Sequence, residues 1–581
     1  MRYHALATDY DGTIAHDGGV DAPTLAALER LRATGRRLLL VTGRELPDLL
    51  RTFAHIHLFD LVVGENGALL YRPSDKNIRL LAEAPPPGFV EELERRGVGP
   101  ISVGESIVAT WVPHENTVLD VIRDMGLELQ VIFNKDAVMV LPAGVNKATG
   151  LKAALKELKL SPHEVVGVGD AENDHAFLAL CECSVAVANA LPAIKERADL
   201  VTDGPRGEGV AQLIDRLAAD DLASLGPKLM RHHFILGKAA EKDVTLDPQG
   251  ATVLVAGPSG SGKSTATTSF LERLMDHGYQ FCIIDPEGDY EGLEKAQVLG
   301  GKQPPTGEEV VRLLETPGTN VVANLIGMAL ADRPAFLLSL LPRLLEMRAK
   351  TGRPHWIVLD EAHHLMPVSW APGETVFPSG LDRAVFITVH PDQVAKQALA
   401  KVNTVLAVGA PRDTLEQFGQ AAGQQVPGNV PEKAGEGEVY LWRKGGEGAM
   451  VALTPCKTQR HRHVRKYAEG ELPPDRSFYF TGPQGAMKLR AQNLVLFAQM
   501  ADGVDDATWT HHLGAGDVSR WFRDHIKDSE LAEEAAAVEK ATLTPQVSRE
   551  RIKEAIAKRY TMPATGPLPM PGTDAAPVHQ E

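Results

Sequence analysis

A glycine-rich loop near the middle of the chain constrains the fold more than any other stretch. The sequence Gly257-Pro-Ser-Gly260-Ser-Gly262-Lys263-Ser264-Thr265 fits the pattern G-x-x-x-x-G-K-[ST], in which backbone N–H groups wrap a phosphate chain. The lysine and the hydroxyls serve the terminal phosphates and Mg²⁺. We predict a buried strand over 252–256 and a helix over 265–275, which would direct its N-terminal dipole at the phosphates. A chance match is the alternative, and the flanking elements disfavour it, so the loop predicts an ATP-binding α/β domain.

Length and composition limit the class of protein. With 581 residues the chain is too long for one core, and we expect three or more units. The net charge of −16 argues against a surface that coats nucleic acid, although it leaves room for a local basic channel. Four scattered cysteines exclude a disulfide framework and predict reduced thiols. The chain starts without an apolar signal region, and its longest apolar run, 334–347, is too short to span a bilayer. We therefore expect a cytoplasmic protein without a membrane partner.

Polar side chains follow three predicted strands in the first part of the chain. Taken singly, such residues are ordinary turn, cap or solvated helix residues. Together they offer carboxylates, a hydroxyl and a cation, mostly at the carboxyl ends of strands, where open α/β sheets bind ligands. The strands are predicted over 4–8, 37–41 and 165–169, and the residues are Asp9, Asp11, Thr42, Lys147, Asp170, Asn173 and Asp174.

These motifs, in this order over residues 4 to about 215, resemble the haloacid dehalogenase superfamily of phosphatases, subfamily IIB. The resemblance implies a phosphomonoesterase in which Asp9 attacks phosphorus to form an aspartyl-phosphate. It implies that Asp11 protonates the leaving group and then activates water, while Thr42 and Lys147 stabilise the phosphoryl group. The Mg²⁺ ligands that it implies are Asp9, the backbone carbonyl of Asp11 and Asp170, supported by Asn173 and Asp174.

An inserted cap is predicted at about 84–144, between the second and third motifs. Its hinge would be the Pro-rich stretch 83–88, and short strands over 107–112 and 137–141 would flank a helix near 117–125. The resemblance implies that the cap chooses a small phosphorylated metabolite, such as a sugar phosphate. Four residues are candidate cap contacts, although each has a simpler structural or solvated role: Trp111, His114, Asn134 and Lys135.

A second acidic pair follows the glycine-rich loop by about a hundred residues. The predicted strand 355–359 ends in Asp360-Glu361, where the aspartate can bind the Mg²⁺–water shell and the glutamate can polarise an attacking water. A buried strand followed by surface acids is the alternative, which this position disfavours. Glu361 favours ATP hydrolysis over phosphoryl transfer to a small acceptor.

The second part of the chain resembles the HerA/FtsK class of motor ATPases over roughly residues 245–453. The resemblance rests on the glycine-rich loop, on I-D-P-E-G-D-Y after the predicted strand 280–285, on L-D-E-A-H-H-L, and on Phe386-Ile-Thr-Val-His390. It implies ATP and Mg²⁺ as cofactors, Ser264 and Asp360 at the metal, His390 as the polar sensor, and a homo-hexamer. Arg412 and Arg383 are the candidates for an arginine that reaches the neighbouring site, although a surface salt bridge explains either equally well. The N-terminal barrel of DNA-pumping relatives is absent, which puts translocation of nucleic acid in doubt.

The remaining stretches give weaker signals. His232 and His233 lack a partner at metal-ligand spacing, so no metal site is predicted there. The basic run 456–466 is expected to be a solvated linker, with nucleic-acid contact as the alternative. Residues 470–562 predict a helical domain of unknown role, with helices over 489–500, 506–513 and 518–534 and a core that includes Trp521, Phe522 and Ile526. Residues 563–581 are expected to be disordered.

We thus predict an α/β protein with a Rossmann-like phosphatase core and an α+β cap over 1–224, a P-loop α/β domain over 225–456, and a small helical domain. The leading hypothesis is a bifunctional phosphatase and ATPase. One alternative is a polynucleotide kinase-phosphatase, which Glu361 and the cap disfavour because a cap restricts access by a polymer. Another is a nucleotide-dependent assembly module that gates the phosphatase.

Overall fold

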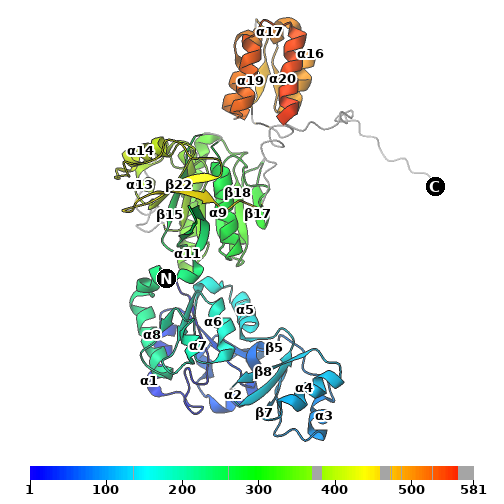
Figure 1. Ribbon diagram of the computed structural model, residues 1–581, viewed down its shortest axis with the longest axis vertical. Helices are drawn as coiled ribbons and strands as arrows, with labels where there is room; N and C mark the ends of the chain where they lie inside the picture. Colours follow the sequence, from blue (N-terminus) through cyan, green and yellow to red (C-terminus); the bar gives the residue numbers. More distant parts are fainter. Residues whose placement is uncertain are drawn as a thin grey trace, which may run out of the picture. The chain divides into compact units, whose positions relative to one another are not determined.

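The computed structural model describes residues 1–134, 136–258, 261–301, 303–369, 382–457, 472, 474–483, 485, 487–526 and 528–559. Most of the basic run and the whole predicted disordered tail lie outside these ranges. The chain divides into two compact units, one of residues 1–257 and 263–457 and one of residues 258–262 and 458–581. The first unit contains two α/β domains, each with its own sheet (Figure 1). In the ranges given above, no helix combines the length and the apolar character needed to cross a bilayer.

The first domain is built on an eight-stranded sheet whose middle is parallel. Its order is β12 (Leu200–Val201), β11 (Cys183–Ala186), β10 (Val165–Gly169), β1 (Ala5–Thr8), β2 (Arg37–Val41), β3 (Leu61–Gly64), β4 (Leu69–Arg72) and β5 (Asn77–Leu80). The strands from β12 to β3 pair in parallel and are almost wholly apolar and buried, as expected for a sheet covered on both faces. The carboxyl ends of β10, β1 and β2 are therefore neighbours at one edge.

Helices of the first domain connect these strands. They are α1 (Ala22–Ala33), α2 (Leu46–Thr52), α5 (Lys147–Glu157), α6 (His175–Leu180), α7 (Pro192–Lys195) and α8 (Arg206–Asp220). The position of α5 is set by Asn146, whose side chain accepts hydrogen bonds from the N–H groups of Ala148 and Thr149. This cap fixes the first turn of α5, which carries Lys147.

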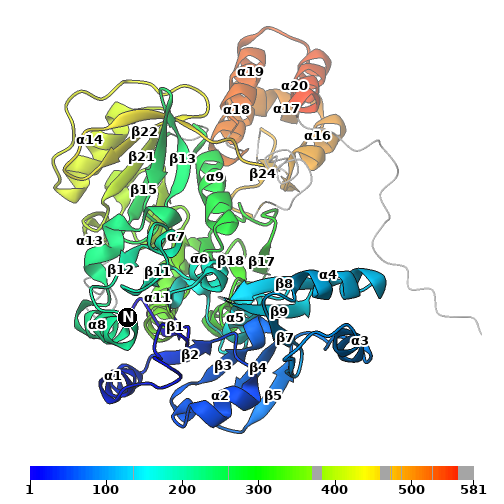
Figure 2. The same ribbon diagram turned by 60° about the horizontal axis from the view of Figure 1, so that its bottom comes forward.

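A cap is inserted between β5 and α5. Its sheet has the order β6 (Ser102–Val103), β7 (Val108–Trp111), β9 (Ala137–Pro142) and β8 (Leu129–Asn134), all antiparallel, with helices α3 (Phe89–Arg95) and α4 (Glu115–Asp124). The strands predicted over 107–112 and 137–141 correspond to β7 and β9, and β6, β8 and α3 were not predicted. Figure 2 shows the cap elements gathered beside β3, β4 and β5 of the first sheet.

The second domain has an eleven-stranded sheet. The order is β14 (Lys242–Leu246), β13 (Phe234–Ala239), β23 (Ala449–Leu453), β22 (Glu438–Arg443), β21 (Thr404–Val408), β15 (Thr252–Ala256), β20 (Ala384–Thr388), β19 (Trp356–Leu359), β16 (Phe281–Asp285), β18 (Asn320–Asn324) and β17 (Ala296–Gly300). The strands from β21 to β17 are parallel, whereas β22, β23, β13 and β14 are antiparallel. The antiparallel strands were not predicted. The helices are α9 (Lys263–Asp276), α10 (Gly307–Leu314), α11 (Arg333–Thr351), α12 (Ala362–Leu365), α13 (Lys396–Leu399) and α14 (Pro411–Ala422).

The two α/β domains meet at a junction formed by His163, Glu164, Tyr279 and His355. The ring of His163 stacks on that of Tyr279 with centroids 3.9 Å apart, and Nε2 of His355 lies 2.7 Å from Oε1 of Glu164. Glu164 directly precedes β10, and His355 directly precedes β19. The junction therefore lies where these two strands begin.

The second unit contains a short hairpin of β24 (Phe478–Phe480) and β25 (Leu489–Ala491) and the helices α16 (Leu494–Gly503), α17 (Asp506–Gly514), α18 (Asp517–Trp521), α19 (Ser529–Lys540) and α20 (Pro545–Arg559). The prediction of one helix over 489–500 was wrong, because 489–491 pairs with β24 and Asn493 then caps α16. The prediction of one helix over 518–534 was also wrong. A π-helical turn covers 522–526, and Asp528 caps the new helix α19. Trp521, Phe522 and Ile526 are buried in the core.

Candidate active sites

The first candidate site lies at the carboxyl edge of the first sheet. Asp9 follows β1, Thr42 follows β2 and Asp170 follows β10, and these three strands are adjacent. The backbone N–H of Asp9 donates to the carbonyl of Val168, which continues the ladder one residue beyond the strand. All three side chains are buried. The parallel sheet therefore brings together residues that are up to 161 positions apart in the sequence.

Lys147 links two of the carboxylates. Its Nζ donates to Oδ1 of Asp9 and to Oδ1 of Asp174, both at 2.6 Å, and its side chain is 2% exposed. Burial raises the pKa of Asp9, the Asp174 carboxylate raises it further, and the ammonium of Lys147 opposes both effects. Burial alone would lower the pKa of Lys147, but Asp174 and Asp9 together raise it. The lysine is thus held as a cation against the predicted nucleophile.

Three carboxylates gather around that lysine. Asp9, Asp170 and Asp174 each offer an oxygen within 4.8 Å of the others, and all three are buried. Their charge exceeds what Lys147 can balance, and their donor atoms are the hard oxygens that Mg²⁺ prefers. A β-carbon at Gly12, whose φ is +86°, would lie 2.3 Å from Oδ2 of Asp170. Gly12 therefore keeps the space in front of Asp170 open, and the donor set fits a divalent cation.

Asp11 has a partner that the sequence did not identify. Arg44 donates to both of its carboxylate oxygens, with Nε to Oδ2 and Nη2 to Oδ1 each at 2.7 Å. A third guanidinium nitrogen of Arg44 donates to Asp48 at 2.7 Å. A bidentate guanidinium stabilises the ionised carboxylate. To act as a general acid, Asp11 has to leave Arg44 and acquire a proton.

Contacts between the core and the cap surround the same site. Glu65 in the loop after β3 accepts hydrogen bonds from the backbone N–H groups of Glu105 and Ser106 in the cap, at 2.9 and 2.8 Å. The next residue, Asn66, accepts a hydrogen bond from Nδ2 of Asn173 at 3.2 Å. Both Glu65 and Asn66 have positive φ, of 50° and 54°, a conformation that costs free energy and is typical of functional loops. These two residues were not predicted from the sequence.

The predicted cap contacts are less informative. Trp111 at the end of β7 is half exposed, and Nε2 of His114 lies 3.0 Å from the carbonyl oxygen of Gly99 within the cap. Lys135 and the side chain of Asn134 lie outside the described part of the chain.

The second candidate site lies at the carboxyl edge of the second sheet. Gly257 follows β15, Lys263 and Ser264 begin α9, and Thr265 follows them. Ser259 and Gly260 lie outside the described residues, and Gly262, with φ of +97°, belongs to the segment 258–262 of the other unit. Within the first unit, Lys263 is buried, Ser264 is half-buried and Thr265 is exposed.

The acidic pair lies at the same edge as the start of α9. Asp360 and Glu361 follow β19, and Asp285 ends the neighbouring strand β16. Burial raises the pKa of Asp360, and the charges of Glu361, Asp285 and Asp289 raise it further. Such a set of buried acids requires a cation. Glu361 itself has φ of 43°, a left-handed conformation that a glutamate adopts only under local constraint.

The predicted sensor stands between the loop and the acidic pair, because β20 lies between β15 and β19 in the sheet. Nδ1 of His363 lies 3.0 Å from Oγ1 of Thr388, and that oxygen also accepts a hydrogen bond from the backbone N–H of His390 at 3.0 Å. Nδ1 of His363 is 3.5 Å from Oε2 of Glu361. A polar chain thus runs from the predicted sensor strand through His363 to Glu361.

The two arginine candidates lie at opposite ends of the parallel strands of the second sheet. Arg383 immediately precedes β20, its backbone N–H donates to the carbonyl of Ala251 before β15, and its side chain is 12% exposed. This is the end of the strands away from the acidic pair. Arg412 begins α14 just after β21 and is exposed, with Nη1 2.8 Å from Oε1 of Glu432. Which of the two arginines reaches a neighbouring site stays a prediction.

Known proteins match the two α/β domains separately. The family model for haloacid dehalogenase-like hydrolases matches residues 6–92 and 126–214. A second model, described as helicase HerA, central domain, matches residues 236–349, which includes the glycine-rich loop and ends before Asp360.

Three curated relatives each match about a third of this chain. Phosphoglycolate phosphatase 2 of Saccharolobus solfataricus is 30% identical over 218 residues, which are 36% of this chain and 91% of that protein. Phosphoglycolate phosphatase of Methanothermobacter thermautotrophicus is 30% identical over 226 residues, 36% of this chain and 97% of its own length. The phosphoglycolate phosphatase of Haloarcula marismortui is 31% identical over 220 residues, 36% of this chain and 95% of its own. Nearly the whole of each relative is thus represented here.

Proposed function

The N-terminal part of this chain belongs to the haloacid dehalogenase-like hydrolases, and from that premise we propose that it hydrolyses small phosphomonoesters through an aspartyl-phosphate on Asp9. The observation that supports this most is the contact of Lys147 with both Asp9 and Asp174, beside Asp170. A buried carboxylate held by a buried ammonium is a positioned nucleophile, and the same ammonium can accompany the phosphoryl group as it arrives.

The reaction would take two steps at the same phosphorus atom. In the first, Oδ of Asp9 bonds to phosphorus, the bond from phosphorus to the ester oxygen breaks, and Asp11 gives its proton to the departing alkoxide. In the second, Asp11 accepts a proton from water, the water oxygen bonds to phosphorus, and the acyl-phosphate bond breaks to release phosphate and Asp9. Thr42, buried beside Asp9, and Lys147 would bind the phosphoryl oxygens throughout.

Asp11 can serve both steps only if its contact with Arg44 is temporary. In the structure the guanidinium takes both carboxylate oxygens. We propose that substrate entry separates the pair and leaves Asp11 beside the ester oxygen. A divalent cation held by Asp9, Asp170 and the carbonyl of Asp11 would offset the repulsion between the anionic nucleophile and the anionic substrate.

The curated relatives suggest where a substrate search should begin. They are named phosphoglycolate phosphatases, so we propose a small phosphorylated carboxylic acid or sugar phosphate as substrate. The test is a phosphatase screen over such metabolites with Mg²⁺, run with and without ATP. Asp9→Asn should abolish phosphate release while leaving ATP hydrolysis intact, and Asp17→Asn, at an exposed carboxylate, should preserve both. Phosphate release by Asp9→Asn at the wild-type rate would exclude Asp9 as the nucleophile.

For the second domain we propose ATP binding and hydrolysis. Lys263 and the loop would hold the phosphates, Ser264 and Asp360 the Mg²⁺, and Glu361 would polarise the attacking water. The chain from Glu361 through His363 and Thr388 to His390 supports a role in sensing the nucleotide. Glu361→Gln should keep ATP affinity and stop turnover. An unchanged ATPase rate would exclude the proposed role of Glu361.

The same purified protein tests the two alternative functions. A kinase assay with 5′-hydroxyl oligonucleotides should give no labelled product, since Glu361 would direct the γ-phosphate to water and not to a hydroxyl acceptor. Labelled product would favour the nucleic-acid repair alternative. If instead ATP alters the phosphatase rate without being consumed, the second domain is a gating module. We propose assembly through the second domain as the route to a homo-hexamer, which sedimentation with and without ATP would test.

A further inference from the structure

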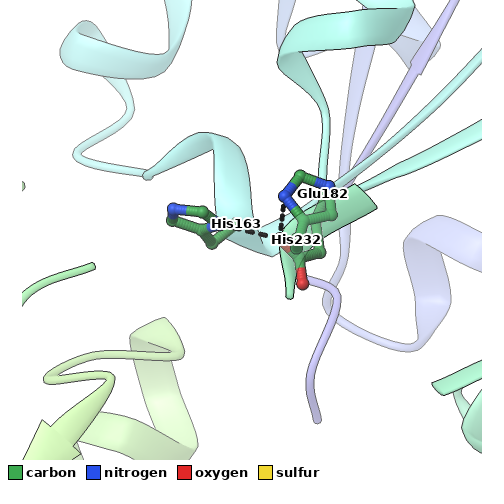
Figure 3. Close-up of side chains that lie close together, drawn as sticks. All are labelled: His163, Glu182 and His232. Carbon is green, nitrogen blue, oxygen red and sulfur yellow. Dashed lines mark hydrogen bonds and ion pairs between the residues drawn. The ribbon is translucent and has the colours of Figure 1, made fainter. Parts of the chain in front are cut away.

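Two histidines and a glutamate from separate segments converge at the junction of the α/β domains. His163 lies in the turn 162–164, Glu182 directly precedes β11, and His232 ends the turn 230–232 before β13. Nδ1 of His163 is 2.7 Å from Oε2 of Glu182, and Nδ1 of His232 is 3.5 Å from the same oxygen. Figure 3 shows both rings at the Glu182 carboxylate. The sequence offered His232 no partner at metal-ligand spacing, and the fold brings it beside residues that lie 69 and 50 positions earlier in the chain.

The hydrogen bonds of His163 leave a place for a cation. Its Nε2 is 2.8 Å from the carbonyl oxygen of His277, and because that oxygen can only accept, Nε2 carries the hydrogen. In a neutral ring, Nδ1 then presents a lone pair to a carboxylate oxygen. Two acceptors at 2.7 Å need a proton or a metal ion between them. A backbone carbonyl on the far nitrogen is also the usual device that orients a metal-binding histidine.

The other oxygen of Glu182 has its own partners. Oε1 accepts hydrogen bonds from Nη2 of Arg2 at 2.9 Å and from Nε2 of Gln249 at 3.0 Å. Glu182 is wholly buried, so these contacts fix the orientation of its carboxylate. Oε2 is consequently the oxygen that faces both histidines.

The position of His232 distinguishes a metal site from a shared proton. A proton between His163 and Glu182 needs only those two groups, whereas a second imidazole directed at the same oxygen completes a ligand set. Nε2 of His232 is buried and has no hydrogen-bond partner among the residues that the structure describes. Two imidazoles and one carboxylate are ligands typical of zinc and its neighbours, and Mg²⁺ prefers oxygen alone.

We propose that His163, Glu182 and His232 bind one divalent transition-metal ion of the zinc class. Ligand atoms about 2.0–2.1 Å from a tetrahedral ion lie about 3.3 Å from each other. Nδ1 of His163 and Oε2 of Glu182 would therefore separate by about half an ångström as the ion replaces the proton. The ion ties the segment that leads into β13 to the first domain, next to the stack of His163 on Tyr279, and so stabilises the junction.

The test uses the full-length protein, stripped with a chelator and dialysed against Zn²⁺ or Co²⁺ in the presence of excess Mg²⁺. We expect one equivalent of zinc by mass spectrometry and a visible Co²⁺ absorption band. His232→Gln should weaken metal binding at least about 100-fold. His233→Gln is the matched control. His233 is the next residue along the chain, but its Nε2 lies 3.9 Å from Oδ1 of Asp247 and it is not part of the cluster.

Each outcome of this experiment decides the proposal. One equivalent retained by the wild type and by His233→Gln, and lost from His232→Gln, supports it. Absence of metal and of the Co²⁺ band in the folded wild type would mean that His163 and Glu182 share only a proton, which overturns it. Equal metal content in wild type and His232→Gln also overturns it. Repeating the titration with Asp9→Asn excludes the first active site as the source, because the equivalent should remain.

Discussion

Replacing Glu164 by glutamine should change how the stability of the protein depends on pH. Nδ1 of His355 accepts a hydrogen bond from the backbone N–H of Gln280 at 2.7 Å, so the ring hydrogen is on Nε2 and is donated to Oε1 of Glu164. Oε2 of Glu164 accepts a hydrogen bond from the N–H of Ser161 at 2.6 Å. Despite these donors, burial raises the pKa of Glu164 to about 7. The carboxylate is therefore buried at the junction at a cost that depends on pH.

The size and sign of the effect follow from that pKa. The interval from the ordinary value of 4.5 to about 7 corresponds to about 3 kcal/mol at 1.36 kcal/mol per pH unit. Because the folded pKa is the higher one, the folded state binds the proton more tightly than the unfolded state. The contribution of Glu164 is fully present below about pH 4.5 and is lost as the pH rises through 7. Glu164→Gln cannot titrate, so between pH 5 and pH 8 its stability should rise by about 2.5 kcal/mol relative to wild type, the remainder being already lost by the wild type at pH 5.

The assay is urea unfolding of wild type and variant at pH 5, 6, 7 and 8, followed by tryptophan fluorescence and circular dichroism. Comparing the two proteins at each pH cancels the titrating groups that do not interact with Glu164. Glu94→Gln on α3 is the control for the substitution itself, because this glutamate is exposed on a cap helix. A difference between Glu164→Gln and wild type that is the same at pH 5 and pH 8, within about 0.5 kcal/mol, would refute the reasoning.

Three further predictions concern the first active site. Gly12→Ala should lower kcat/KM for phosphomonoesters at least about 100-fold, because its β-carbon would lie 2.3 Å from Oδ2 of Asp170. The control is Gly35→Ala, which should retain activity because Gly35 has a similar φ and no atom within 4 Å of the added carbon. Lys147→Met should cost about 3–5 kcal/mol in urea unfolding without Mg²⁺, less at acid pH where the carboxylates protonate, and an unchanged midpoint would contradict the buried ion pair. Glu65→Ala removes two hydrogen bonds to the cap and should raise KM more than it lowers kcat, as measured by steady-state kinetics.

The parallel strands and their terminal acids could be predicted from sequence because both signals are local. A buried parallel strand is a short apolar run, and its end is marked by the first polar residue, as at Asp9, Asp170 and Asp360. The sheet then brings those ends together, whatever their separation in sequence. The pairing of Arg44 with Asp11 could not be predicted, since a charged residue after a strand has many partners available to it.

Other features depend on contacts that no local pattern contains. The hairpin of β13 and β14 follows an irregular segment, and its place is decided by pairing with β23, more than 200 residues later. Residues 489–491 fit a helix and a strand equally well by hydrophobicity, and the deciding signal was the capping preference of Asn493. The cluster at Glu182 required His163 and His232 to be brought together by folding, which spacing along the chain could not show.

The place of the junction also sets it apart from the two proposed sites. Glu164 and His355 touch where β10 and β19 begin, and the proposed catalytic acids stand where those strands end, each about 15 Å farther along its own strand. The contact that joins the two domains is therefore made at the strand ends opposite to both proposed sites. If both proposed reactions take place, the residues of the junction hold the domains together without belonging to either reaction.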